Sequence, residues 1–491
     1  MTEVPASSAD VPDPRRWKAL AVCFVGGFVT MLDVSIVNVA LPSMQSALAA
    51  GPTQLQLVVA GYSLAFGLVL VPFGRLGDAR GRRTMFMIAM AGFAATSLLA
   101  GLAQKDTQLA IARLFQGVFA GMSNPQVSGM TQQMFRGRER ARAFGYFGAV
   151  IGVSTALGPL VGGIILAVAG TTTGWRWIFL INVPICLAVL PLARCYLPTP
   201  PPGTTSTRLD PIGLLLIGLG TATFMAPFVT TPATGFFDQP WRWAWLIPAG
   251  LLAPVTYWWE RRYQRRFQAA VLNPGLLHNP SYLYGAALGC AYFAGFTALM
   301  LVVSMMLQIG LGHAALVAGL VQLPYAVASG VCASQAGRLV PRMGRALVVG
   351  GLATTLFGLG LVIVIMRVAP PTTVVWALGA ALFLMGAGNG AVISPNQALT
   401  FQDVPPQYGS VAGAVLQVGQ RTGSSVGVAI VLAVYLSLVA TRTPTAGLGD
   451  AARFAASTSL TISAGFIAIA LLIAILDLRR RTGTGVPLNR P

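Results

Sequence analysis

GRLGDARGR (residues 74–82) and GRLVPRMGR (residues 337–345) are two short stretches that carry the same five residues in the same positions. Their starting points are 263 residues apart (337 − 74). A weaker match of the same kind pairs Gly117, Gly121 and Pro125 with Gly386, Gly390 and Pro395. Because many polytopic membrane proteins are built from duplicated helical bundles, the repeat predicts two related halves.

The chain around these stretches is strongly apolar. Of its 491 residues 55% are hydrophobic and 9% are charged, whereas roughly 25% of residues are charged in an ordinary soluble domain. A helix needs about 20 apolar residues to cross a bilayer, so we expect an all-α polytopic membrane protein. Fourteen suitable stretches occur, at residues 18–41, 55–73, 84–103, 108–131, 143–168, 177–197, 211–230, 243–259, 282–308, 314–337, 346–366, 374–398, 409–436 and 455–477.

The repeat also predicts how these fourteen transmembrane helices are grouped. Its offset covers eight predicted spans, which gives two six-helix bundles separated by two additional helices, a 6+2+6 arrangement. The predicted parts are an N-terminal tail (1–17), an N-terminal six-helix bundle (18–197), a cytoplasmic linker (198–210), the additional pair (211–259), a basic cytoplasmic linker (260–281), a C-terminal six-helix bundle (282–477) and a tail (478–491).

The net charge of +19 is explained by topology. If both termini are cytoplasmic, the cytoplasmic segments carry 24 of the 32 Lys and Arg residues and the outer loops carry six. This is the positive-inside bias of helical membrane proteins, and it predicts a multi-pass protein of the cytoplasmic membrane. Nucleic-acid binding is not expected because no basic soluble domain is present. Cysteine and histidine spacing predicts no metal site and no cofactor.

MLDVSIVNVALP (31–42) places Asp33 in the first predicted span, and of thirteen acidic residues it alone lies deep in a span. A charge at a helix centre costs about 2.5–3.5 kcal/mol on insertion scales. Arg113 in the fourth span is expected at a similar depth. Desolvation disfavours an ionised carboxylate and a nearby cation favours it, which suits an exchange of proton for substrate. The alternative is a static ion pair that holds two helices together.

Arg421 lies roughly 18 Å into the thirteenth predicted span. It is predicted either to contact substrate or relay charge, or to bind backbone carbonyls and extend along its own helix. Candidate substrate-cavity residues are Asn38, Gln116, Met306 and Tyr325, with the core or the lipid face as the alternative environment for such side chains.

Gly158, Pro159, Gly162 and Gly163 in the fifth span leave room for a neighbouring helix and remove one backbone donor. They predict a span that can bend, or simply close packing.

Several stretches resemble signatures of the major facilitator superfamily, specifically its fourteen-helix drug/proton antiporters of the EmrB/QacA type. The stretches that carry this resemblance are GRLGDARGRR (74–83), LDVSIVNVALP (32–42), ARLFQGVFAG (112–121), ALGPLVGG (156–163) and WRWIFLINVP (175–184). They lie in the first half of the chain, while the 6+2+6 arrangement covers nearly all of it.

The resemblance implies a proton-coupled antiporter, not an enzyme, that exports lipophilic drugs or antibiotics by alternating access. The single deep acid and the two deep arginines predict a monocationic, neutral or zwitterionic substrate. Because ALGPLVGG (156–163) resembles the antiporter motif, Gly158, Pro159, Gly162 and Gly163 are expected to form a bending or sliding surface that favours exchange over symport.

The resemblance also implies that Asp78 latches the two halves on the cytoplasmic side, against the start of the thirteenth span. This cytoplasmic gate comprises Gly74, Asp78, Arg80, Gly81 and Arg82.

In the second copy of the repeat Pro341 replaces Asp78, so only one half is expected to carry the latch. The arginines of the gate also enforce topology. The expected partners are protons, small lipophilic substrates and the bilayer, and the expected state is a monomer. Alternatives are a dedicated exporter of one endogenous metabolite or lipid, and a non-transporting membrane receptor.

Overall fold

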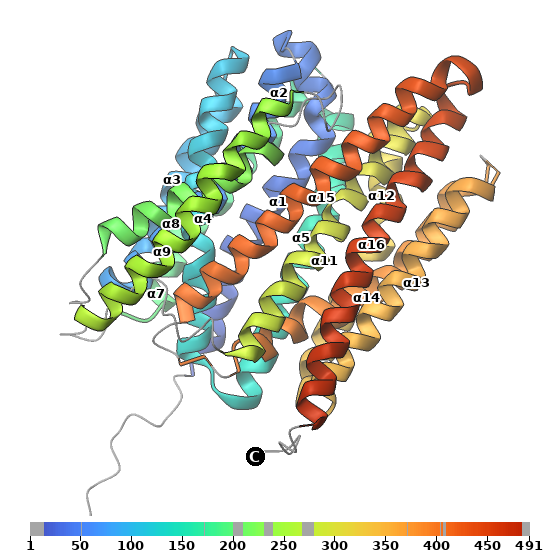
Figure 1. The fold of residues 1–491 in the computed structure, drawn as a ribbon. Helices are drawn as coiled ribbons and strands as arrows, with labels where there is room; N and C mark the ends of the chain where they lie inside the picture. Colours follow the sequence, from blue (N-terminus) through green and yellow to red (C-terminus); the bar gives the residue numbers. More distant parts are fainter. Residues whose placement is uncertain are drawn as a thin grey trace, which may run out of the picture.

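The computed structural model describes residues 14–50, 52–170, 172–199, 210–229, 239–267, 279–370, 372–402, 404–405 and 409–483, and every regular element in them is a helix. Figure 1 shows their arrangement. The N-terminal half comprises α1 (Arg16–Leu48), α2 (Pro52–Arg80), α3 (Arg82–Leu102), α4 (Asp106–Met134), α5 (Gly137–Ala169), α6 (Gly174–Leu180) and α7 (Asn182–Tyr196). Next come α8 (Pro211–Val229), a short 3-10 turn η1 (Pro240–Trp245) and α9 (Leu246–Phe267). The C-terminal half comprises α11 (Pro280–Met305), a π-helical turn η2 (Met306–Gly310), α12 (Ala315–Met343), α13 (Arg345–Val368), α14 (Val374–Thr400), α15 (Gly409–Ala446) and α16 (Leu448–Gly483).

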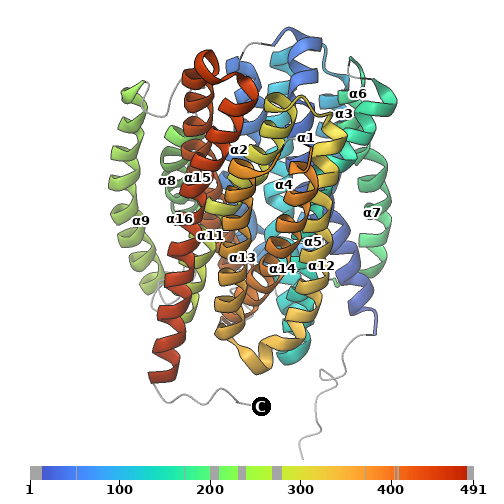
Figure 2. The same ribbon diagram turned by 90° about the vertical axis from the view of Figure 1, so that its right-hand side faces the viewer.

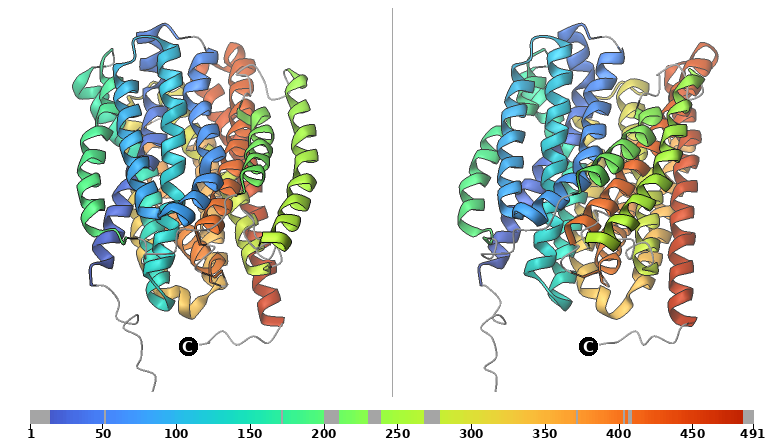
Figure 3. Two further views of the ribbon diagram at one scale, coloured as in Figure 1. Left: turned by 90° about the vertical axis from the view of Figure 1, so that its left-hand side faces the viewer. Right: turned by 60° about the vertical axis from the view of Figure 1, so that its left-hand side comes forward.

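The two halves lie side by side, and α8 and α9 stand at the edge of the bundle (Figure 2). Helix α8 packs against α2 of one half and α15 of the other, and α9 packs against α8. Figure 3 shows the same pair of helices from the opposite side. Helix α1 begins and α16 ends at the same end of the bundle (Figure 1), which we call the terminal end.

Within the described residues, twelve helical segments are long and apolar enough to cross a membrane. The chain is therefore a multi-pass membrane protein. Helices α4 and α9 are not among the twelve, so composition alone does not establish the predicted fourteen spans. Helix α4 carries a long run of buried polar residues, and α9 continues to Phe267 through the arginines of the predicted basic linker. Most of the predicted tails and of the 198–210 linker lies outside the described residues.

The sequence repeat corresponds to equivalent helix packing in the two halves. A Cβ atom placed on Gly117 of α4 would lie 2.3 Å from the carbonyl oxygen of Tyr62 on α2. A Cβ atom on Gly386 of α14 would lie 2.3 Å from the carbonyl oxygen of Tyr325 on α12. Since Tyr62 and Tyr325 are also 263 residues apart (325 − 62), both glycines allow the same close approach of helix backbones.

The halves contact each other closely at the terminal end. One buried apolar cluster draws its members from both halves, and within it the rings of Phe144 on α5 and Phe401 beyond α14 have centroids 5.3 Å apart. Nearby, the amide of Gln417 on α15 donates to the hydroxyl of Ser128 on α4 at 3.4 Å. These contacts close the terminal end between the halves.

Candidate functional site

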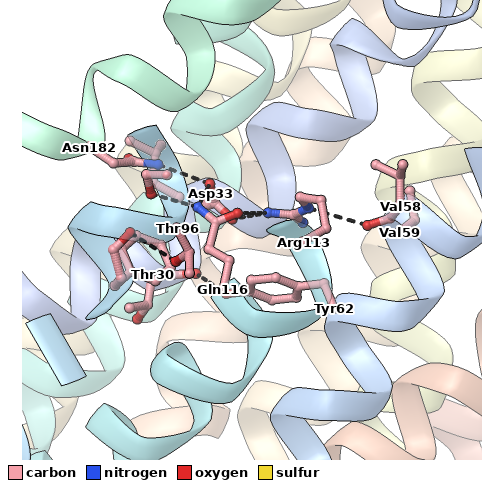
Figure 4. A network of polar contacts seen from close by, with 12 residues as sticks. Thr30, Asp33, Val58, Val59, Tyr62, Thr96, Arg113, Gln116 and Asn182 are labelled. Carbon is pink, nitrogen blue, oxygen red and sulfur yellow. Dashed lines mark hydrogen bonds and ion pairs between the residues drawn. The ribbon is translucent and has the colours of Figure 1, made fainter. Parts of the chain in front are cut away.

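Asp33 is fully buried and accepts hydrogen bonds from three side chains (Figure 4). Its Oδ2 lies 2.5 Å from Nη1 of Arg113. Its Oδ1 accepts from the amides of Gln116 at 3.1 Å and Asn182 at 2.9 Å. Both carboxylate oxygens are therefore satisfied, by residues of α4 and of α7. The depth argument from sequence placed Asp33 and Arg113 at a similar level, and the structure brings them together.

Arg113 has partners of its own besides Asp33. Its Nε donates to the carbonyl oxygen of Val58 at 3.2 Å, and its Nη1 donates to Oε1 of Gln116 at 2.7 Å. Its Cζ lies 4.1 Å from the ring centroid of Tyr62, a cation–π contact. Arg113 and Gln116 are three residues apart on α4 and so share one helix face. The arginine is held in place on several sides and is 2% exposed.

Asn182 reaches Asp33 because the sixth predicted span is broken. Helix α6 ends at Leu180 and α7 begins at Asn182, so this residue occupies the first turn of a new helix. The unpaired N–H groups at a helix start carry partial positive charge, which favours a nearby anion. The sequence analysis missed Asn182. The available signal was its position within the stretch WRWIFLINVP (175–184), which carries part of the family resemblance.

A cavity of about 120 Å³ lies between the two halves. Its walls come from α1, α4 and α5 on one side and from α11, α12, α14 and α15 on the other. Most of its polar wall residues are amides, and Arg421 is the one charged group among the described residues that line it. The larger polar residues of the wall are Asn38, Asn124, Gln322, Gln397, Gln417, Gln420 and Arg421. Asp33 is not part of this wall.

Arg421 belongs to the C-terminal half but contacts the N-terminal half. Its Cζ lies 4.0 Å from the ring centroid of Phe66 on α2, and its Nη2 lies 3.3 Å from the sulfur of Met31 on α1. The Phe66 ring is 6.2 Å from that of Tyr62, the ring beneath Arg113. A continuous series of side-chain contacts therefore joins the buried carboxylate to the cavity.

The other residues predicted for the cavity lie in different environments. Asn38 is in the wall, whereas Gln116 belongs to the Asp33 network. Tyr325 is buried behind the wall and stacks on the wall residue Phe296 at 5.6 Å. Met306 lies in the apolar core of the C-terminal half.

The predicted antiporter motif on α5 packs against α1. Pro159 lines the cavity. A Cβ atom on Gly158 would lie 2.0 Å from the Ser35 hydroxyl, and one on Gly162 would lie 3.1 Å from a side-chain carbon of Ile36. Gly163 is buried on the same helix. The glycines therefore allow α1 and α5 to approach closely beside the cavity.

The predicted gate lies at the turn between α2 and α3. Oδ1 of Asp78 accepts from Nε and Nη2 of Arg82 at 3.0 and 2.9 Å, and Gly81 adopts a φ of +100°, which favours glycine. Gly74 is buried and Arg80 is exposed. Oδ2 of Asp78 is buried and accepts no hydrogen bond within the described residues. Residues 406–408, just before α15, lie outside the description, so the latch stays a prediction.

The comparisons with known proteins identify the family. The model of the Major Facilitator Superfamily matches residues 23–211 and 205–428. The chain belongs to the Major Facilitator Superfamily. The fold agrees, since this family member superimposes on the human organic anion transporter MFSD10 (TETRAN) with a TM-score of 0.64 at 14% identity, covering 94% of this chain and 100% of that one. It superimposes equally well on the proton:xylose symporter XylE, at 15% identity with 97% of each chain covered.

Relatives of this facilitator include proteins named for antibiotic transport and for drug resistance. It is 32% identical to the "Probable actinorhodin transporter" of Streptomyces coelicolor, over 91% of this chain and 77% of that protein. It is 33% identical to "Puromycin resistance protein pur8" of Streptomyces alboniger, over 97% and 92% of the two chains. It is 32% identical to the "Putative multidrug resistance protein MdtD" of Klebsiella pneumoniae, over 86% of each. The chain is therefore a transporter and not an enzyme.

The C-terminal half of this facilitator contains a second buried ion pair that the sequence analysis missed. Arg345 corresponds to Arg82 in the repeat (345 − 82 = 263), and its Nε lies 2.5 Å from Oδ2 of Asp477 on α16. Its Nη1 also lies 2.5 Å from Oδ1 of Asn396 on α14. Where Pro341 replaces the acid of the first copy, the last helix supplies a carboxylate instead. The only sequence signal was Asp477 itself, next to a run of arginines at the helix end.

Proposed function

We propose that this facilitator is a proton-coupled antiporter that exports lipophilic small molecules across the cytoplasmic membrane by alternating access. The observation that carries the proposal is the fully buried Asp33–Arg113 pair, which Tyr62 and Phe66 connect to a cavity lined by both halves. A buried ion pair contributes little net stability compared with apolar packing, so its presence inside a transporter favours a functional role.

We propose fourteen membrane spans in the 6+2+6 arrangement of the EmrB/QacA type. Helix α4 has 29 residues, and α9 has 22, and about 20 residues suffice to cross a bilayer. The polar residues in the interior of α4, from Arg113 to Gln132, are buried in the protein and do not face lipid. The positive-inside bias places the terminal end in the cytoplasm. Because one chain supplies both walls of the cavity, we propose that it acts as a monomer.

In this proposal Asp33 carries the proton. Ionised Asp33 binds Arg113 at 2.5 Å, whereas a protonated carboxyl loses the charge attraction. Arg113 then keeps the Val58 carbonyl and the Tyr62 ring, and the link between α1 and α4 weakens. Proton binding therefore favours a different packing of these two helices. The alternative remains a static pair that only fastens α1 to α4.

The proposal is tested by transport in proteoliposomes that contain equal amounts of folded protein. Asp33→Asn keeps a side chain that can accept from Gln116 and Asn182 but cannot ionise. We expect dye efflux driven by a pH gradient to fall at least about 100-fold, the lower end of the contribution typical of a proton-transfer group. Asp450→Asn, at an exposed acid of α16, is the control and should transport normally. A wild-type efflux rate that does not depend on the pH gradient would refute proton coupling.

A dedicated exporter of one endogenous metabolite is the second candidate. It is favoured by the relatives named for single antibiotics, actinorhodin and puromycin, and by the many amides of the cavity wall, which can form directional hydrogen bonds. Competition of a panel of unrelated dyes for efflux separates the two. Broad competition indicates a drug exporter, and competition by one chemical family only indicates a dedicated exporter.

A further inference from the structure

We infer that the cargo of the central cavity is a lipophilic aromatic acid, whose anionic group pairs with Arg421. The inference rests on the proposed transport function and specifies its substrate class. The prediction of monocationic, neutral or zwitterionic cargo assumed that Asp33 faces the substrate. The structure places Asp33 behind the cavity wall, where three donors already occupy its oxygens.

The charge of the cavity wall favours an anion. Arg421 is the single charged residue among the described residues of the wall, and six of the ten other polar residues there are amides. A cationic cargo would meet an arginine with no carboxylate beside it. An anionic cargo would meet a fixed positive charge surrounded by neutral hydrogen-bond donors.

Arg421 is held in position but keeps donors available. Its guanidinium stacks on Phe66 and makes one side-chain hydrogen bond, to the Met31 sulfur, a weak acceptor. In the described part of the chain no carboxylate pairs with it. A guanidinium carries five N–H donors in a planar fork that matches a carboxylate. The most favourable partner for this group is therefore an anionic acceptor supplied by the cargo.

Two buried amides of the wall also lack partners. Gln322 on α12 is fully buried, and neither its Nε2 nor its Oε1 makes a hydrogen bond among the described residues. Oε1 of Gln397 on α14 is also buried and accepts no hydrogen bond from the described residues. Buried polar groups in folded proteins are nearly always satisfied. We infer that cargo or water in the cavity satisfies these amides.

The same wall also fits an aromatic body. Phe293, Phe296 and Met300 on α11 line the cavity, and the Phe296 ring packs near-parallel to the rings of two tyrosines. Its interplanar angles are 8° to Tyr292 and 18° to Tyr325. Flat rings and methionine thioethers provide favourable contact for a planar aromatic molecule. At about 120 Å³ the cavity is smaller than typical ligand sites of roughly 300–1,000 Å³, so the halves must separate to admit such cargo.

The charge of the cargo fixes the charge moved in each cycle. Exchange of one entering proton for one departing anion carries two charges in the same electrical direction. A neutral cargo carries one, and a monocation carries none. An imposed membrane potential therefore distinguishes the three classes independently of affinity.

The test uses three pyrene probes with the same aromatic body and different charge: 1-pyrenebutyrate, 1-pyrenebutanol and 1-pyrenebutylammonium. Binding to the purified full chain is measured by fluorescence anisotropy. We expect pyrenebutyrate to bind about tenfold more tightly than the alcohol, the effect of one charge-assisted hydrogen bond, and the ammonium to bind most weakly. Arg421→Gln should remove the preference for the acid, and Arg421→Lys should keep part of it.

Arg442→Gln is the matched control, because it makes the same change at an exposed arginine of the same helix. Size-exclusion profiles confirm that each variant is folded. Tighter binding of the ammonium, or an acid preference that Arg421→Gln leaves intact, would overturn the inference.

Proteoliposome flux separates this inference from the proposed function. Arg421-dependent binding of pyrenebutyrate without any flux driven by the proton gradient would support the inference and refute antiport. Gradient-driven flux of the ammonium that a membrane potential does not stimulate would support antiport and refute the inference.

Discussion

Replacement of Arg113 by glutamine tests how strongly the buried ion pair is coupled. The two side chains are 0% and 2% exposed and their charged atoms are 2.5 Å apart. Removing one partner of such a pair leaves a buried charge uncompensated, which costs about 3–5 kcal/mol. For Arg113→Gln we expect a loss of this size, because Gln116 and Asn182 are neutral donors that only partly replace a cation.

The opposite change, Asp33→Asn, should cost less, about 2–3 kcal/mol. Arg113 would still have the Val58 carbonyl, Oε1 of Gln116 and the Tyr62 ring, and a desolvated cation–π contact alone contributes about 2 kcal/mol. The double variant contains no buried charge. We expect its loss to be at least about 2 kcal/mol smaller than the sum of the single losses, in the range found for residues in contact.

The assay is reversible unfolding in mixed micelles, with increasing fractions of a denaturing detergent, followed by tryptophan fluorescence. All four proteins of the cycle are compared under one condition. Additive losses, with the double variant equal to the sum of the two singles, would refute the reasoning, because the two charges would then be independent. A cost below about 0.5 kcal/mol for Arg113→Gln would show that the pair is as weak as a surface ion pair.

Further predictions concern single residues. Phe66→Leu removes the ring beneath Arg421, so probe binding should persist while proton release on binding decreases; unchanged release would exclude this ring from coupling. Asp477→Asn leaves a buried arginine without its carboxylate and should cost about 3–5 kcal/mol, measured by the same unfolding assay. Asn182→Ala removes one donor to a charged carboxylate and should cost about 1.5–3 kcal/mol; a neutral result would mean that this donor is replaced by water. Gly386→Ala places a Cβ atom 2.3 Å from a backbone oxygen and should lower the free energy of unfolding by about 1–3 kcal/mol. The control is Gly360→Ala, whose Cβ atom would have no neighbour within 4 Å. In thermal melts this control should be neutral or slightly stabilising.

The sequence predicted the parts of this structure that depend on composition and on depth along a helix. Apolar length identified the helices, and the arginine-rich repeat indicated the two halves. Asp33 and Arg113 could be paired because opposite charges at equal depth in an apolar bundle have few other partners. Gln116 was assigned to the cavity but binds Asp33. From one sequence, the rotation of α4 about its own axis could not be determined well enough to separate these two faces.

The remaining site residues depend on tertiary structure that leaves no local pattern. Asn182 reaches the carboxylate only because the sixth span breaks at Ile181. From the sequence, Asp477 is expected to be a surface charge near a helix end. In the structure it binds Arg345, which lies more than a hundred residues earlier in the chain. Helix α11 is apolar on all sides, so periodicity could not show that Met300 on this helix lines the cavity while Met306, in the following turn η2, lies in the core.

The separation of Asp33 from the cavity determines what kind of exchange is possible. A shared group would let proton and cargo displace each other directly, but here the carboxylate is enclosed and the cargo site is lined by other residues. Tyr62 and Phe66 lie one turn apart on α2, and each supports one of the two arginines, Arg113 and Arg421. Coupling between two binding sites is reciprocal, so if bound cargo changes the proton affinity of Asp33 through Phe66 and Tyr62, protonation of Asp33 must change the cargo affinity by the same factor. Since packed interiors change between discrete arrangements and do not deform continuously, the proposed exchange is a shift between two packings of α1, α2 and α4.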